Sequence, residues 1–150
     1  MKIALGCDEA AYRLKVAIQA HLEQKGIETV DFGANAGETV LYPDVAFAVA
    51  SAVAKGEYER AILVCGTGIG MSIVANKVPG VRAAVCHDPF SAQRARKSNN
   101  AQIMCMGERV IGEELAKCLV DIWLECEFAG GGSTPKVERI AELEKASLKG

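Results

Sequence analysis

The sequence predicts an α/β fold, a three-layer α/β/α sandwich built around a five-stranded parallel sheet and closed by a C-terminal helix. Short apolar runs alternate with amphipathic stretches nearly from end to end, and glycine or proline marks several of the helix ends. Strands that alternate with helices are joined by right-handed crossovers, which make the sheet parallel and cover both of its faces. The 150 residues fit one domain, 1–150, since domains typically run to roughly 100–150 residues. We therefore expect a Rossmann-like arrangement with one main site.

The apolar runs give the strands and, with them, the region where a site is expected. They predict strands at Lys2–Cys7, Ile27–Phe32, Arg60–Cys65, Val81–Cys86 and Gln102–Met106. In open parallel sheets ligands bind beyond the carboxyl ends of the strands. The loops to examine are therefore those at residues 7–11, 33–43, 65–70, 86–91 and 107–112.

Apolar residues at helical spacing predict the helices. Leu14, Ala17, Ile18 and Leu22 mark the buried face of the first one, which ends at Gly26. The second helix is expected after Pro43, with Val45, Val49 and Val53 inward, and the next two over residues 68–76 and 89–97. The fifth is expected around Leu115, Leu119, Ile122 and Trp123. A last helix is expected in the C-terminal segment, with Val137, Ile140 and Leu143 inward.

Composition and charge exclude several classes of function. The chain is 50% hydrophobic and 24% charged with a formal net charge of −2, so it lacks the basic stripe of a nucleic-acid-binding protein. Its apolar stretches are far shorter than the ~20 residues that a membrane span needs. The opening "MKIALG" is too short for a signal peptide because polar residues follow at once. We expect a cytoplasmic protein with no membrane partner.

Cysteine and histidine are present without the spacing of a metal site. The six cysteines form no CxxC pair and several lie in apolar runs, which favours reduced, mostly buried thiols. Of the two histidines, His21 is expected to face solvent, and His87 lies near the expected site without an evident partner. Because there is no cluster of His, Asp or Glu, we predict no metal.

The stretch "AILVCGTGIGMSIVANK", residues 61–77, holds the strongest chemical signal. Cys65 ends the third strand, and glycines after it allow consecutive backbone N–H groups to point into one space at the start of a helix. Such a loop favours an anion and would lower the pKa of a neighbouring thiol. Turns of small residues also serve simply as packing, so the loop alone decides nothing. It is neither a dinucleotide fingerprint nor a P-loop, which leaves a phosphate or carboxylate cradle or an enediolate-type oxyanion hole.

Asp8, Tyr42 and Thr67 converge with Cys65 on the carboxyl edge of the predicted sheet. Each has an ordinary explanation: Asp8 as a helix N-cap, Tyr42 as a half-buried packing residue, and Thr67 as a partner of its own turn. Farther along, Arg109 is either a surface residue or a phosphate clamp. A second basic cluster, Arg94, Arg96 and Lys97 before "SNN", is expected to be solvated charge at a helix end.

Taken in order, these motifs resemble the ribose-5-phosphate isomerase B family, the RpiB/LacA/LacB sugar-phosphate isomerases. The resemblance covers essentially the whole chain and rests on "GCDEAAYRLK" at the start, "YPD" at 42–44, "CGTGIGMSIVANKVPGVRAAVC" at 65–86, "ARKSNNAQIMCMGERVIG" at 95–112 and "EFAGG" at 127–131. It implies interconversion of an aldose phosphate and a ketose phosphate through a cis-enediolate, with no metal or organic cofactor.

The resemblance also implies roles for individual residues. Cys65 would be the base that moves a proton between C1 and C2, and Asp8 and Tyr42 would contact the sugar oxygens. Asn99 and Arg109 would come from another subunit, so the resemblance implies a homodimer or a dimer of dimers with shared active sites. The enediolate oxygens would be held by Thr67 and by the backbone of Gly66, Gly68, Ile69 and Gly70.

The chain departs from the family pattern at positions that bear on the choice of substrate. Members that act on ribose 5-phosphate usually read Asp-His at the first motif and Arg-x-His-Asn at the fourth, where this chain has Glu9 and Ser98. The second of those histidines is held to open the furanose ring, and a serine at this catalytic position is a poor acid or base. Where the family commonly reads "GGRHxxR", this chain has "GGGSTPK", with Gly132 and Lys136 in place of the arginines. The phosphate ligands are then expected to be Arg109 and Lys136, with Arg139 as a further candidate.

These departures favour an open-chain substrate. A tetrose phosphorylated on O4 has no free hydroxyl with which to close a furanose, so D-erythrulose 4-phosphate and D-erythrose 4-phosphate need no ring-opening group. Glu9 would repel a phosphate where a histidine attracts one. The alternatives are a pentose or hexose phosphate, such as ribose 5-phosphate, and a catalytically silent sugar-phosphate-binding regulatory module. A flavodoxin-like nucleotide module lacks its fingerprint here.

Overall fold

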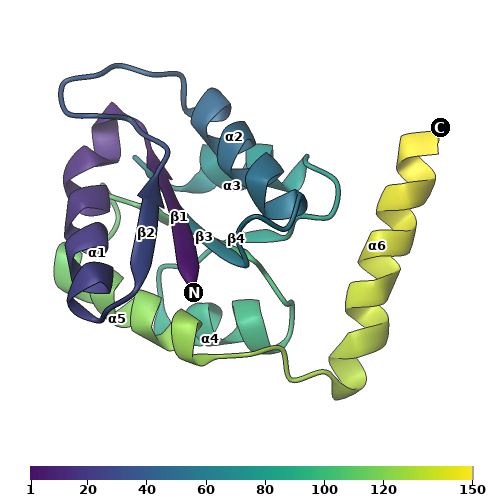
Figure 1. Cartoon of the computed structure of the whole chain (residues 1–150). Helices are drawn as coiled ribbons and strands as arrows, with labels where there is room; N and C mark the ends of the chain where they lie inside the picture. The colour runs from purple at the N-terminus through teal and green to yellow at the C-terminus, as the bar shows by residue number, and fades with distance from the viewer. Residues whose placement is uncertain (150) are drawn as a thin grey trace.

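A parallel five-stranded sheet forms the middle layer of the structure, a computed structural model that describes residues 1–149 (Figure 1). The strands run in the order β2-β1-β3-β5-β4, and every neighbouring pair is parallel. This confirms the predicted fold class, with strand ends that differ from the expected ones by up to two residues. The strands are β1 Lys2–Cys7, β2 Glu28–Asp31, β3 Arg60–Cys65, β4 Ala83–Val85 and β5 Ile103–Gly107.

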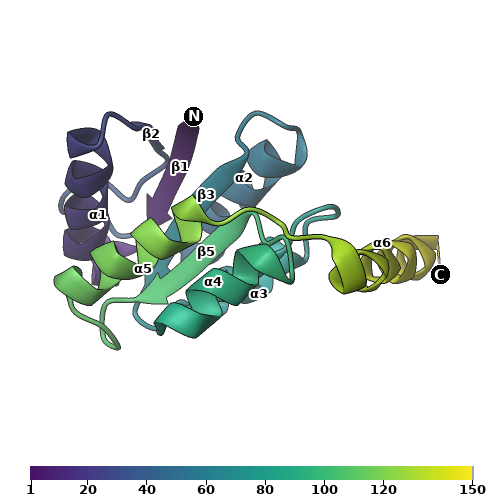
Figure 2. The ribbon, with the colours of Figure 1, turned by 90° about the horizontal axis from the view of Figure 1, so that it is seen from below.

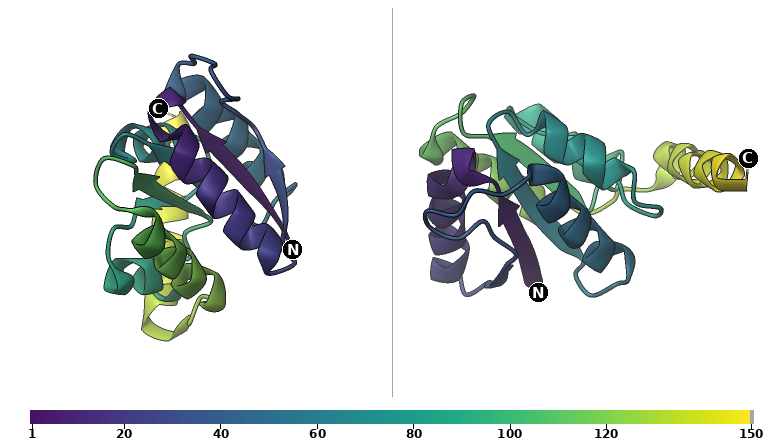
Figure 3. Two further views of the ribbon diagram at one scale, coloured as in Figure 1. Left: turned by 90° about the vertical axis from the view of Figure 1, so that its left-hand side faces the viewer. Right: turned by 90° about the horizontal axis from the view of Figure 1, so that it is seen from above.

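Helices cover both faces of the sheet, as Figures 2 and 3 show. One core joins Ile3, Leu5 and Cys7 of β1 to α1, α4 and α5, and a second core on the other face packs α2 and α3. Side chains of a strand alternate between its two faces, so β1, β3, β4 and β5 each contribute to both cores. The helices are α1 Tyr12–Gln24, α2 Tyr42–Ala54, α3 Ile69–Asn76, α4 Pro89–Lys97, α5 Glu113–Glu125 and α6 Thr134–Lys149, with 3-10 turns η1 Glu9–Ala11 and η2 Gly131–Ser133.

The buried faces predicted for α1, α2 and α5 are largely confirmed, and the differences have physical reasons. Leu14, Ile18 and Leu22 of α1 are buried as expected, but so is Lys15, whose Nζ contacts the Asp31 carboxylate at 2.9 Å and the Ala34 carbonyl at 2.5 Å. A buried ammonium is tolerated when all its protons find acceptors. In α5, Leu119 and Trp123 are buried, whereas Leu115 is exposed on the outer side of the helix.

Arg96 and His21 also differ from expectation. Arg96 is buried, and its guanidinium donates to the Ala101 carbonyl at 2.8 Å and lies 3.5 Å from the Glu127 carboxylate. His21 does not simply face solvent, because its Nε2 lies 2.7 Å from the Asp121 carboxylate. All six cysteines are free thiols and all but Cys118 are buried, as predicted.

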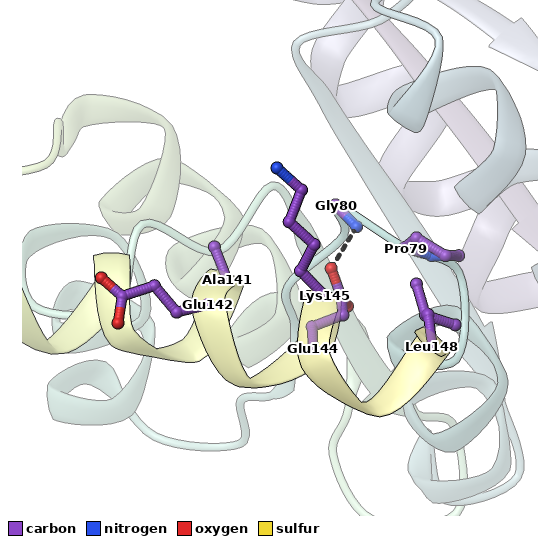
Figure 4. Close-up of a pocket in the computed structure, with 7 residues that line it drawn as sticks. All are labelled: Pro79, Gly80, Ala141, Glu142, Glu144, Lys145 and Leu148. Carbon is purple, nitrogen blue, oxygen red and sulfur yellow. Dashed lines mark hydrogen bonds between the residues drawn. The ribbon is translucent and has the colours of Figure 1, made fainter. Parts of the chain in front are cut away.

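Helix α6 stands away from the rest of the molecule (Figures 1 and 2). None of its residues, 134–149, is buried, and the side chains of Ile140 and Leu143 are 47% and 53% exposed. The prediction that Val137, Ile140 and Leu143 face inward is therefore wrong for Ile140 and Leu143, while Val137 is half-buried. Glu144 of α6 accepts a hydrogen bond from the Gly80 N–H at 2.8 Å (Figure 4). Both residues line a hollow of about 530 Å³, which Leu148 also lines. Among residues 1–149, no helix is long and apolar enough to cross a membrane.

Candidate active site

Cys65 is the last residue of β3, and its neighbours place it beside the start of a helix. It is paired with Gly107 of β5, and the adjoining Val64 is paired with Cys7 of β1. The Cys65 sulfur accepts a hydrogen bond from the Gly68 N–H at 3.0 Å. An N–H aimed at the sulfur stabilises negative charge there, which is what a thiolate base requires.

The turn that follows Cys65 is shaped by glycines where no side chain fits. Gly68 is the N-cap of α3 in the left-handed region, with φ +79, and a Cβ there would lie 2.9 Å from the Met106 backbone. Thr67 Oγ1 accepts from the Ile69 N–H at 3.3 Å, the turn-forming contact that was one of its two expected explanations. The turn therefore rests directly on the end of β5 and turns its exposed side, with the start of α3, to the solvent.

Asp8 follows β1 at the same edge of the sheet. Its carboxylate accepts the Ala10 N–H at 3.1 Å, so it caps η1 as the ordinary explanation required. It also lines the hollow beside Cys65. Burial raises the pKa of Asp8, and the neighbouring charge of Glu9 acts in the same direction. Asp8 can cap η1 and also line the hollow, because one carboxylate oxygen accepts the Ala10 N–H and the other remains free for a ligand.

Tyr42, at the start of α2, lies against the backbone of Gly70. A Cβ on Gly70 would come within 2.6 Å of the Tyr42 hydroxyl oxygen, so the tyrosine can occupy this place only because residue 70 is glycine. The phenol thereby reaches the first turn of α3, where free N–H groups and the helix dipole favour an anion.

Arg109 reaches the same hollow from the loop after β5. Its Cδ, Nε and Cζ lie 3.5–3.6 Å from the position of a Cβ on Gly66, so the side chain runs along the turn. The expectation that another subunit supplies Arg109 is therefore corrected: the Arg109 of the same chain lies beside its own Cys65. The hollow has a volume of about 390 Å³ and is lined by Asp8, Tyr42, Cys65, Gly66, Thr67, Ile69, Gly70, Ile73 and Arg109.

Four of the expected site residues lie elsewhere in this chain. Glu9 lines a neighbouring hollow, and its carboxylate accepts the Val40 N–H at 3.3 Å. Ser98 and Asn99 follow the end of α4, at the opposite edge of the sheet from Cys65. Lys136 is exposed near the start of α6. Among residues 1–149, no group of three or more His, Cys, Asp or Glu side chains is arranged to hold a metal ion.

Sequence reasoning missed one residue at this edge, Ile73, and found no partner for another, His87. Ile73 lines the hollow one helical turn after Ile69, and this spacing was available as a signal for the exposed face of α3. His87 does have a partner, because its Nε2 accepts the Gly107 N–H at 2.9 Å. That contact joins residues 20 apart in the sequence, so no local sequence pattern predicts it.

A protein-family model described as Ribose/Galactose Isomerase matches residues 3–140. The chain belongs to the ribose/galactose isomerase family. Within this family it is 57% identical over 145 residues to a D-erythrulose-4-phosphate isomerase of Pectobacterium atrosepticum, covering 96% of this chain and 95% of that protein. It is 53% identical over 145 residues to a Ribose-5-P isomerase B of Listeria innocua, covering 97% and 98%. The solved structure of ribose-5-phosphate isomerase B from Clostridium thermocellum matches with a TM-score of 0.95 at 48% identity, covering 98% of this chain and 99% of that one.

These matches confirm the resemblance stated from the motifs. The chain is a sugar-phosphate aldose-ketose isomerase of the ribose/galactose isomerase family, and its substrate is a phosphorylated sugar. The reading as an enzyme, rather than as a silent regulatory module, is confirmed with it. Which sugar phosphate the isomerase takes is a separate question, because its relatives carry different names.

Proposed function

We propose that this isomerase interconverts D-erythrulose 4-phosphate and D-erythrose 4-phosphate, with Cys65 as the base. The observation that carries the proposal is Ser98, which stands where ring-opening members of the family have a histidine. The Ser98 hydroxyl accepts a hydrogen bond from Arg94 Nε at 2.7 Å, so it is held by its own helix. A serine does not titrate near neutral pH, and a substrate that needs no ring opening loses nothing by its presence.

In the proposed reaction Cys65, as a thiolate, takes a proton from C1 of the ketose. The C1–H electron pair forms the C1=C2 double bond, and the carbonyl π electrons move to O2, which gives an enediolate. Gly66, Thr67, Ile69 and Gly70 border the hollow in which that negative charge develops. Transfer of a proton from O1 to O2 and return of the Cys65 proton to C2 give the aldose.

The first motif supports a short substrate as well. The Glu9 carboxylate holds the Val40 N–H and lies outside the hollow that Cys65 lines. A histidine at this position would bring a cation to the site, whereas Glu9 adds negative charge beside Asp8. We infer that the phosphate of the substrate lies toward Arg109, on the other side of the hollow.

We propose that the active form is a homodimer, or a dimer of dimers, in which each site is shared and residues 1–150 act as one domain. Helix α4 starts at the Cys65 edge of the sheet and runs for nine residues, roughly 13 Å, away from it before Ser98 and Asn99 follow. These residues, and Lys136 on α6, can approach a Cys65 hollow only on another copy of the chain.

Exposed apolar side chains support the same proposal. Ile69 and Ile73 of α3, which line the hollow, are more than half exposed. So are Phe47 of α2 and, on α6, Leu143 and Leu148. Large apolar side chains gathered on a surface mark contact sites between proteins. A second copy of this chain would cover both surfaces, and it would bring Lys136 toward the phosphate end of the hollow.

Ribose 5-phosphate remains the second candidate. The 53% identity to the Listeria innocua protein named Ribose-5-P isomerase B favours it, as does the 47% identity to Ribose-5-phosphate isomerase B of Escherichia coli. In that case a group other than Ser98 has to open the ring.

The two substrates are separated by kcat/KM measured with erythrulose 4-phosphate, ribose 5-phosphate and galactose 6-phosphate. We expect the tetrose to be preferred by about a hundredfold, the usual contribution of one general acid or base. The Ser98→His variant should raise kcat/KM for ribose 5-phosphate far more than for the tetrose. A parent enzyme that prefers a ring-forming sugar would overturn the substrate assignment.

The role of Cys65 has its own test. In deuterated water the Cys65→Ala variant should lose exchange of the C1 proton of erythrulose 4-phosphate, while Cys118→Ala, which changes an exposed thiol, should exchange at the parent rate. Equal exchange by Cys65→Ala and the parent would show that another group is the base.

A further inference from the structure

His87 makes an unusual contact just beyond the end of β4. Its Nε2 lies 2.9 Å from the N–H of Gly107, the last residue of β5. A backbone N–H can only donate, so Nε2 accepts and must carry no proton. The contact therefore exists only while the imidazole is neutral.

The imidazole stands where a backbone acceptor is missing. The Cys86 N–H donates to the Cys105 carbonyl at 3.0 Å, which continues the β4–β5 ladder by one bond. In a regular parallel ladder the Gly107 N–H would next donate to the Cys86 carbonyl, but the chain turns away there toward α4. Gly107 is buried, and a buried N–H needs a partner. His87 supplies one in place of the strand.

Gly107 is the surface on which the Cys65 turn rests. A Cβ on Gly107 would lie 2.5 Å from the Thr67 Cα and 2.7 Å from the Gly66 carbonyl oxygen. The two residues after Gly107 are joined to the same turn, because Glu108 donates to the Cys65 carbonyl at 3.0 Å and Arg109 donates to the Gly66 carbonyl at 3.1 Å. A shift of Gly107 would move the turn and the Arg109 backbone together.

We propose that His87 is a positioning residue of this isomerase, whose neutral imidazole holds the end of β5 under the Thr67–Gly68 turn and so fixes the donors around Cys65. The inference rests on the proposed role of that turn in catalysis. It does not depend on which sugar phosphate is the substrate. Below the pH at which His87 takes up a proton, Nε2–H would face the Gly107 N–H, the bond would be lost and the turn would loosen.

The surroundings keep the imidazole neutral near pH 7. Burial lowers the pKa of His87, and the negative charge of Asp88 opposes this only in part. The Asp88 carboxylate is engaged elsewhere, because it accepts the Ser91 N–H at 2.8 Å and the Ser91 hydroxyl at 2.6 Å at the start of α4. The neighbouring Cys86 thiol is neutral, since burial raises its pKa to about 12. On the β5 side, burial likewise raises the pKa of Cys105, and the charged residues nearest in sequence are Glu108 and Arg109.

Three variants test the proposal. His87→Gln offers an amide oxygen near the position of Nε2 and does not titrate, whereas His87→Leu offers no acceptor. His21→Gln is the matched control, because His21 is the other histidine of the chain and pairs with Asp121 between α1 and α5.

The readout is kcat/KM against pH. At about pH 8 we expect His87→Gln to match the parent, and His87→Leu to be about tenfold or more slower at every pH because the catalytic donors are misplaced. Between about pH 7 and pH 5 the parent should lose activity that His87→Gln keeps, by roughly threefold or more. The substrate phosphate also titrates near pH 6, but it does so equally for every variant. Parent and His87→Gln profiles that superimpose, or a His87→Leu enzyme as active as the parent, would overturn the proposal.

A second measurement needs no substrate. In a pH titration followed by ¹H–¹⁵N correlation spectra, the Gly107 amide should shift with the same midpoint as the His87 ring in the parent and in His21→Gln, and should not titrate in His87→Gln. If the chemical shift of the Gly107 amide does not follow the titration of His87, the contact itself is wrong. Failure to turn over erythrulose 4-phosphate would instead overturn the substrate assignment alone, because the profiles can be recorded with ribose 5-phosphate.

Discussion

Asp8 is placed so that its charge costs stability at neutral pH. Burial raises its pKa in the folded chain, so over the interval between the unfolded value and the raised one the folded state binds more protons than the unfolded state. The contribution of Asp8 to the free energy of unfolding therefore falls as the pH rises through that interval. A carboxylate kept under this penalty is typical of a functional site.

Asp8→Asn tests this balance. Asparagine caps a helix as well as aspartate and carries no charge. We expect the urea midpoint at pH 7 to rise and kcat/KM to fall. At a pH near 3, where Asp8 is protonated in both states, the variant and the parent should unfold at the same urea concentration. An Asp8→Asn protein that is less stable than the parent at pH 7 would contradict the argument.

Much of the hollow around Cys65 could be predicted from the sequence because parallel strands bring their carboxyl ends to one edge. Cys65 ends a strand, and Asp8 and Arg109 closely follow strands, so their convergence needs only the strand positions. The contacts of Lys15 and His87 could not be predicted, because both side chains end on backbone groups far away in the sequence. Local patterns identify the residue type that needs a partner, and only the folded chain supplies the partner.

At the scale of elements, the end of α5 is held by the first residue of β3. The buried Arg60 guanidinium donates to the carbonyls of Trp123 at 2.8 Å, Leu124 at 3.1 Å and Cys126 at 2.7 Å, and it contacts Glu127 at 2.8 Å. The last carbonyls of a helix have no partner within it, so Arg60 completes α5.

Arg60→Met should therefore lower the free energy of unfolding by about 3 kcal/mol or more, because it leaves buried carbonyls unpaired. Glu127→Gln should cost about 1 kcal/mol or less, since the Glu127 side chain is 77% exposed. Urea unfolding of both variants measures the difference. Equal losses would mean that the ion pair, and not the carbonyls, holds the end of α5.

Helix α6 marks the limit of what an amphipathic pattern reveals about an element. The spacing of Val137, Ile140 and Leu143 correctly predicts a helix with an apolar side, but the spacing does not say which surface covers that side. For α1 to α5 the covering surface is the sheet of the same chain. For α6 it is not.

At the scale of the whole molecule, the exposed side of α6 predicts an assembly that can be taken apart without unfolding. Replacing both Ile140 and Leu143 by glutamate should convert the proposed oligomer to monomer in sedimentation equilibrium, with loss of activity. The circular dichroism spectrum should stay unchanged, because no described residue of α6 is buried.

Val16→Glu is the matched control, since Val16 is an exposed apolar residue on α1. It should leave the oligomer and the activity intact. A parent protein that sediments as a monomer and is fully active would contradict the shared site.

The two edge strands of the sheet affect how copies of this chain can associate. The outermost strands, β2 and β4, are four and three residues long. Such short borders offer few free backbone groups to a strand from another molecule, which protects the protein from pairing sheet to sheet into aggregates. Association is left to side chains on helices, and those change by single substitutions while the hydrogen-bonded frame stays as it is.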